Sequence, residues 1–181
     1  MTSTLTPTQI FENLQQTLNG YVAKLDVYSD EQFAQKPSET EWSLGQMYEH
    51  LYRSSTFFFL ANTLRCLDQR KGQVGGEKNE YGDKLYKYNS FPPIKVKIPE
   101  VLRGPEPVAQ TRDDYRLHFA AIAADAQKMI EAVATDAGEY KCIQPAFGWL
   151  NAHEWFHLHE MHVRHHLRQQ KELEEWLGGE F

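Results

Sequence analysis

Apolar side chains near the start of the chain recur at three- and four-residue steps, which is the spacing of one buried helix face. The set runs Ile10, Phe11, Leu14, Leu18, Tyr21, Val22 and Leu25. Ahead of it, Thr6 and Gln9 can form a capping box, and Pro7 suits the first helical position. The pattern therefore predicts a first helix that begins after Thr6 and ends near Val27.

A second long helix is predicted to begin at a further capping box, formed by Ser43 and Gln46. Its expected inner face reads Leu44, Met47, His50, Leu51, Ser54, Phe58, Ala61 and Leu64. One histidine, His50, thus lies inside an apolar stripe. Between the two long helices, the box from Ser29 to Gln32 predicts a short helical turn that ends before Pro37.

Two more long helices are predicted in the second half of the chain. Thr111 and Asp114 form a box-like start, and the helix after them ends near residues 136–138. Asn151 and Glu154 form another box, and the last helix runs to about Leu177. Four long amphipathic helices with almost no strand signal predict an all-α, up-down-type four-helix bundle, with residues 1–181 forming a single domain.

Periodicity breaks down between the second and third long helices, over residues 68–107. Glycines and prolines interrupt this stretch: Gly72, Gly75, Gly76, Gly82, Pro92, Pro93, Pro99 and Pro105. A short extended piece is expected at residues 94–98, where flanking prolines exclude a central strand. Connections of this length in compact domains tend to be functional or crossover segments. We expect aromatic side chains of this loop to cover the mouth of the bundle: Tyr81, Tyr86, Tyr88 and Phe91.

Composition narrows the functional class. The chain of 181 residues is 41% hydrophobic and 24% charged, with a formal net charge of −6, as expected of a globular protein without nucleic-acid partners. It has neither an apolar stretch long enough to cross a membrane nor a signal-peptide pattern at its start. Cys66 and Cys142 have no CxxC spacing, so no disulfide framework or thiolate zinc site is indicated. We therefore expect a cytoplasmic protein.

Histidines are concentrated in the predicted last helix. Six of the chain's eight lie there: His153, His157, His159, His162, His165 and His166. Residues four apart share a helix face, so His162 and His166 can direct two imidazoles at one divalent metal ion. His50, on the inner face of the second helix, is the histidine best placed to be a third ligand. His153 and His165 point in other directions, and His118 is interpreted as structural or exposed.

A competing motif overlaps this cluster, because residues 153–157 match HExxH, the signature of zinc peptidases. The match is weakened by Val163, which occupies the place of the third histidine in the longer form of the signature. The shorter form takes a glutamate ligand from a later helix, and no such helix is predicted. Glu154 is also explained as a helix-capping residue. A di-iron site would need a second ExxH motif, which is absent from the sequence.

Two segments resemble a known family. Residues 36–51, with Glu41-Trp42-Ser43-Leu44-Gly45-Gln46 and Glu49-His50-Leu51, are similar to the start of the second helix in the DinB/YfiT-like superfamily. Residues 145–169 are similar to the last-helix segment of that family, and the middle loop has no match. The resemblance implies a four-helix bundle that holds a divalent metal, often nickel or zinc, at His50, His162 and His166. It also implies activities such as metal-dependent thiol transfer, with low-molecular-weight thiols such as bacillithiol or mycothiol, or isomerisation.

Three neutral imidazoles leave a coordination position open, which is typical of catalytic sites. We therefore expect an enzyme that acts on a small molecule by hydrolysis or by thiol transfer. Residues expected to orient a ligand histidine or bind substrate are Glu49, Glu160, His165 and Gln169. The alternative is a non-catalytic metal-binding or stress-response protein, in which the ion mainly stabilises the bundle. Exposed apolar faces would also support a homodimer.

Overall fold

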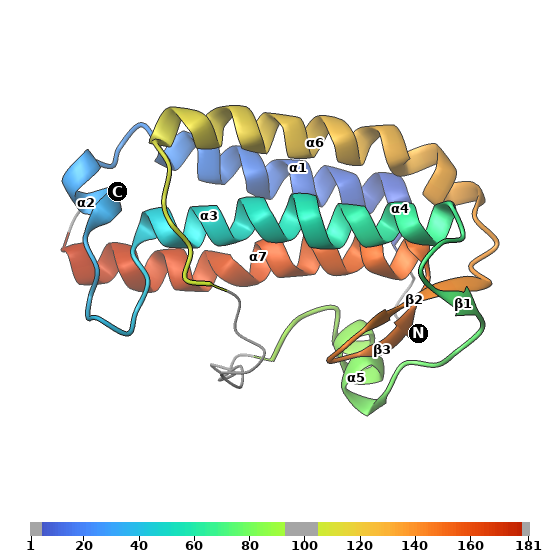
Figure 1. The fold of residues 1–181 in the computed structure, drawn as a ribbon. Helices are drawn as coiled ribbons and strands as arrows, with labels where there is room; N and C mark the ends of the chain where they lie inside the picture. The colour runs from blue at the N-terminus through green and yellow to red at the C-terminus, as the bar shows by residue number, and fades with distance from the viewer. Residues whose placement is uncertain (1–4, 93–104, 179–181) are drawn as a thin grey trace.

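Helices dominate the computed structural model, which describes residues 5–92 and 105–178. The long helical segments are α1 (Pro7–Lys24), α3 (Leu44–Ser54) continued by η1 (Ser55–Leu60) and α4 (Ala61–Leu67), α6 (Arg112–Thr135) and α7 (Ala152–Leu177). They lie side by side, with α1 against both α6 and α7, and with the α3–α4 segment facing α7 (Figure 1). The predicted helical class is confirmed. None of the helices in the described ranges is long and apolar enough to span a membrane.

The predicted capping boxes are present at the start of each of these segments and of the short helix α2 (Asp30–Ala34). At Ser43, for example, the hydroxyl accepts from the backbone N–H of Gln46 at 3.1 Å, and the Gln46 side chain accepts from the Ser43 N–H at 3.0 Å. These bonds satisfy backbone donors that the first helical turn leaves free. α1 ends at Lys24, earlier than predicted, and the chain continues as a hydrogen-bonded turn to Val27.

A π-helical turn, η1, interrupts the second long helix and changes which residues face inward. Before the turn, Leu51 is buried as predicted. After it, Leu64 is 38% exposed. The buried positions are Ser55, Phe59 and Leu60 within the turn, and Asn62, Thr63 and Cys66 after it. A π turn adds one residue to the helix, so the buried face advances by one position along the sequence. Beyond Ser54 the predicted inner face is therefore shifted: Phe58 and Ala61 are only partly buried, and Leu64 is exposed.

A small three-stranded antiparallel sheet lies at the end of the molecule where α7 begins (Figure 1). Its strands are β1 (Gln73–Val74), β2 (Tyr140–Gln144) and β3 (Gly148–Leu150), in the order β1-β2-β3. Cys142 pairs with Leu150. Both side chains pack into a second hydrophobic cluster, around Trp155, which is separate from the main core that α1, α3, α6 and α7 form. The prediction of a purely α-helical chain is thus incomplete, because these strands are too short to show an alternating pattern.

The connection predicted over residues 68–107 also contains helix α5 (Glu80–Tyr88), which is capped by Asn79 at its start and by Asn89 at its end. The Asn79 side chain accepts hydrogen bonds from the N–H groups of Tyr81 and Gly82, each at 3.0 Å. Leu85 provides its buried apolar contact. The extended piece expected at residues 94–98 lies outside the described residues.

Gly148 connects the sheet to the segment before α5, and its substitution should destabilise the protein. Its φ is +88°, and a Cβ there would lie 2.7 Å from the Glu77 carbonyl oxygen. We expect Gly148→Ala to cost about 1–3 kcal/mol of unfolding free energy, measured by urea denaturation. The control is Gly20→Ala, on α1, where a Cβ meets nothing within 4 Å. It should stabilise the protein by up to about 1 kcal/mol, and an equal loss in both variants would contradict this account.

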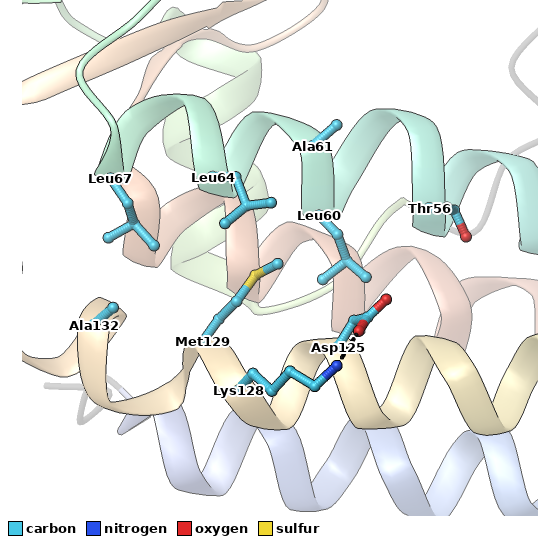
Figure 2. Close-up of a pocket in the computed structure, with 9 residues that line it drawn as sticks. All are labelled: Thr56, Leu60, Ala61, Leu64, Leu67, Asp125, Lys128, Met129 and Ala132. Carbon is cyan, nitrogen blue, oxygen red and sulfur yellow. Dashed lines mark hydrogen bonds and ion pairs between the residues drawn. The ribbon is translucent and has the colours of Figure 1, made fainter.

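An apolar groove of about 440 Å³ runs between the η1–α4 segment and α6 (Figure 2). Leu60, Leu64 and Met129 line it, and the ion pair between Lys128 and Asp125, at 2.8 Å, lies at its edge. The three histidines predicted to bind metal do not line this groove. The groove is therefore separate from the candidate metal site.

Candidate metal centre

Three histidines from two helices meet where α3 faces α7. The Nε2 atom of His162 lies 3.1 Å from Nε2 of His50 and 3.2 Å from Nε2 of His166. Each residue offers one ring nitrogen, and the three nitrogens all lie within 4.8 Å of one another. His162 and His166 are one helical turn apart on α7, while His50 reaches them from α3. All three are partly buried, so the cluster lies at the edge of the helix packing.

The donor set fits a divalent cation. Two imidazole nitrogens bound to one tetrahedral ion at 2.0–2.1 Å would lie roughly 3.3 Å apart, close to the separations found here. Burial lowers the pKa of His50 to about 4 and that of His166 to about 3, and it lowers the pKa of His162 well below its usual range. All three rings are therefore neutral at pH 7 and carry the free lone pair that a metal requires.

A glutamine on α7 orients one of the rings. The Nδ1 atom of His166 donates to the Oε1 atom of Gln169 at 2.8 Å, which leaves the His166 Nε2 lone pair directed at His162. Hydrogen bonds of this kind fix the tautomer and orientation of metal-binding histidines. The Nδ1 atom of His162 is buried and has no hydrogen-bond partner among the described residues.

Of the other predicted supporting residues, Glu49 and Glu160 form hydrogen bonds away from the cluster, and only His165 lies beside it. Glu49 accepts from the Tyr115 hydroxyl at 3.0 Å and from the Gln110 amide at 2.8 Å, so it ties α3 to the start of α6. Glu160 is almost completely buried and accepts two hydrogen bonds from Arg164. The ring of His165 lies beside His166, with centroids 5.5 Å apart.

The histidines of the HExxH sequence do not converge on one point. His153 donates to the backbone carbonyl of Leu5 at 2.9 Å, and His157 donates to the side chain of Asn89 at 2.8 Å. Glu154 completes the capping box with Asn151 and forms an ion pair with Lys78. Each of the three residues thus fastens a different part of the chain to α7, which does not support the peptidase interpretation.

Aromatic rings surround the histidine cluster. The Trp42 ring lies 5.0 Å from His50, and the Phe59 ring lies 4.7 Å from His162, measured between centroids. Of the four loop aromatics expected to cover the mouth of the bundle, Phe91 lies near the site, 5.0 Å from His165 and 6.2 Å from His162. The expectation is wrong for Tyr81 and Tyr88, which are exposed, and Tyr86 contacts the Glu154 carbonyl instead. Phe59 was missed as an inner-face residue because the π turn brings it into the place expected for Phe58. Trp42 stands in the sequence motif before His50, but its spacing alone predicts no contact.

Stability should fall in mild acid because of His157. Burial lowers its pKa to about 4, with smaller contributions from His153 and Arg164, while Glu160 lies 4.0 Å away. Between the usual value of 6.5 and the lowered one, the unfolded chain binds more protons than the folded chain. The contribution of neutral His157 to the free energy of unfolding is therefore complete above pH 6.5 and is lost as the pH falls towards 4.

The measurement is urea unfolding of the wild type and of His157→Gln at pH 7 and pH 5. The substitution should reduce the stability difference between the two pH values by about 1–2 kcal/mol, since glutamine does not titrate. An unchanged difference would show that His157 does not contribute to the acid sensitivity.

Comparison with protein-family models finds a match over most of this chain. The model described as the DinB superfamily matches residues 10–170, a range that includes all three clustered histidines. No curated protein matches the chain.

Proposed function

Because the chain belongs to the DinB superfamily and brings three neutral histidines together, we propose that it is a metal-dependent enzyme. One divalent ion, zinc or nickel, would be held by His50, His162 and His166. The observation that carries this proposal is the convergence of three Nε2 atoms in a cluster to which none of the described residues adds a carboxylate. We also propose that the four long helical segments form an up-down bundle, which the contacts among α1, α3, α6 and α7 support.

A divalent ion at this position would act as a Lewis acid that lowers the pKa of a water or thiol beside it. Other residues of the chain would hold the three ligand histidines in the orientation that a metal ion requires. Gln169 holds His166 in the tautomer that presents Nε2, and Trp42 and Phe59 restrict the rings of His50 and His162. Three protein ligands leave a position for substrate. The reaction we propose is hydrolysis of a small molecule, or transfer of a low-molecular-weight thiol to one.

The test compares two assays on protein loaded with zinc or nickel. One measures hydrolysis of activated esters and amides, and the other measures conjugation of a thiol to an aromatic electrophile. We expect metal-dependent turnover in one of them, with loss in His50→Ala and retention in His153→Ala. The control is matched because His153 is also a histidine but donates to the Leu5 carbonyl instead of facing the cluster.

A metal ion without turnover, and without any spectral response of a cobalt-loaded sample to added ligands, would contradict the enzyme proposal. It would instead favour a non-catalytic metal-binding protein. A closed coordination sphere excludes substrate, whereas an open one exchanges ligands.

A further inference from the structure

The segment from Lys78 to Phe91 is fastened along α7 by residues that the metal site does not use. Lys78 forms an ion pair with Glu154, and the Tyr86 hydroxyl donates to the Glu154 carbonyl at 2.7 Å. Farther along α7, His157 contacts Asn89, the last of these attachment points. The part of the sequence that resembles a peptidase signature thus serves as the attachment site for this segment.

Asn89 ends α5 in the left-handed conformation, with φ of +50°. Its side-chain oxygen accepts from His157 Nε2 at 2.8 Å, and its backbone carbonyl accepts from Arg164 Nη2 at 2.9 Å. Arg164 is itself held by Glu160, with hydrogen bonds of 2.6 and 3.1 Å. Two α7 side chains therefore determine where the chain goes after α5.

Two residues after Asn89, the ring of Phe91 reaches the histidine cluster. Its centroid lies 5.0 Å from that of His165, 6.2 Å from that of His162 and 5.9 Å from that of Phe147. Phe91 is only partly buried, so part of its side chain stays exposed. An aromatic ring close to ligand-type nitrogens offers an apolar surface to whatever occupies the open position.

We propose that Phe91 contacts the substrate at the metal site and that Asn89, His157 and Arg164 are positioning residues for it. The site would then select small molecules in which the metal-binding atom carries an aromatic or apolar group. This inference rests on the proposed metal-dependent function. It adds the substrate class and gives a role to the buried side chains of His157 and Glu160.

The experiment uses cobalt-loaded full-length protein and two probes that both bind metals through nitrogen, imidazole and 4-phenylimidazole. Visible absorption of the cobalt gives the affinity for each probe. The wild type should prefer 4-phenylimidazole, and Phe91→Ala should reduce that preference by about 2- to 10-fold, the range for one aromatic pair. The matched control is Phe57→Ala, since Phe57 is 61% exposed and does not contact the cluster. It should keep the wild-type preference.

The positioning role is tested at Asn89 and His157. Asn89→Gly keeps a residue that tolerates the left-handed conformation but removes the acceptor, so it should lower the preference as Phe91→Ala does. His157→Phe should do the same, whereas His157→Gln retains a donor and should stay within about twofold of the wild type. Cobalt affinity should be unchanged in all of these variants, which separates positioning of Phe91 from damage to the metal ligands.

The two levels of the proposal fail in different ways. If the wild type binds no cobalt, or its spectrum ignores both probes, the proposed function is wrong and the inference falls with it. If both probes bind but Phe91→Ala keeps the wild-type preference, only the inference is overturned. If Phe91→Ala lowers the preference while Asn89→Gly and His157→Phe do not, Phe91 contacts the ligand without the positioning residues proposed here.

Discussion

Replacing His162 with alanine should produce a folded protein that no longer binds a metal ion. The Nε2 atom of His162 lies between those of His50 and His166, at 3.1 and 3.2 Å, so its loss separates the two remaining donors. Mutating a residue that only hydrogen-bonds to a ligand histidine typically lowers metal affinity by about 10- to 100-fold. Removing a ligand itself should therefore lower it by more than about 100-fold. The measurement is elemental analysis of protein purified without an affinity tag, supported by titration calorimetry with zinc and nickel.

The wild type should carry about one ion per chain, and His50→Ala and His166→Ala should lose it as His162→Ala does. His153→Ala should keep it. Loss of the ion in His153→Ala alone would restore the HExxH interpretation. Chelation gives a second readout, since an ion at 100 times its dissociation constant stabilises the fold by about 2.7 kcal/mol. Added EDTA should therefore lower the melting temperature of the wild type and leave that of His162→Ala unchanged.

Replacing Trp155 with alanine should cause the largest loss of stability among single substitutions in the sheet end of the molecule. Trp155 is completely buried, and its Nε1 atom donates to the Cys142 carbonyl of β2 at 3.3 Å. Its ring packs edge-on against Phe58, with centroids 5.2 Å apart. The substitution removes a large side chain and a connection between α7, the sheet and η1. We expect a cost of about 3–5 kcal/mol, measured by urea unfolding followed by circular dichroism.

The matched control for this substitution is Trp176→Ala, on the same helix. Trp176 is 43% exposed, so its replacement should cost less than about 1 kcal/mol. Similar losses in the two variants would mean that the second hydrophobic cluster does not depend on Trp155. A larger loss at Trp176 would place the stabilising contacts at the other end of α7.

The helices could be predicted from sequence because their signals are local. A capping box such as Ser43 with Gln46 depends on two residues three apart, and each predicted box is present. The grouping of His162 with His166 follows equally from a four-residue spacing. His50 was placed on the correct face because it precedes the π turn, where a regular helical period still applies.

The parts that could not be predicted depend on contacts between distant residues. β1 consists of Gln73 and Val74, which are both exposed, and only pairing with β2 makes them a strand. The π turn has no local signature in the sequence, so the buried positions beyond Ser54 are shifted from the predicted ones, and Leu64 is exposed. The hydrogen bonds of Glu49 and Glu160 could not be predicted, because their partners, Gln110 and Arg164, decide what the carboxylates do.

The π turn also sets where this segment can change length. Each residue advances an α-helix by about 100°, so deleting one residue within α3 or α4 would rotate everything after it relative to His50. In η1 the wide turn already accommodates one extra residue, so deleting one residue there returns the segment to a regular α-helix. Thr63 and Cys66 would then still face inward. Single-residue deletions in η1 should consequently be less damaging than single-residue deletions in α3 or α4.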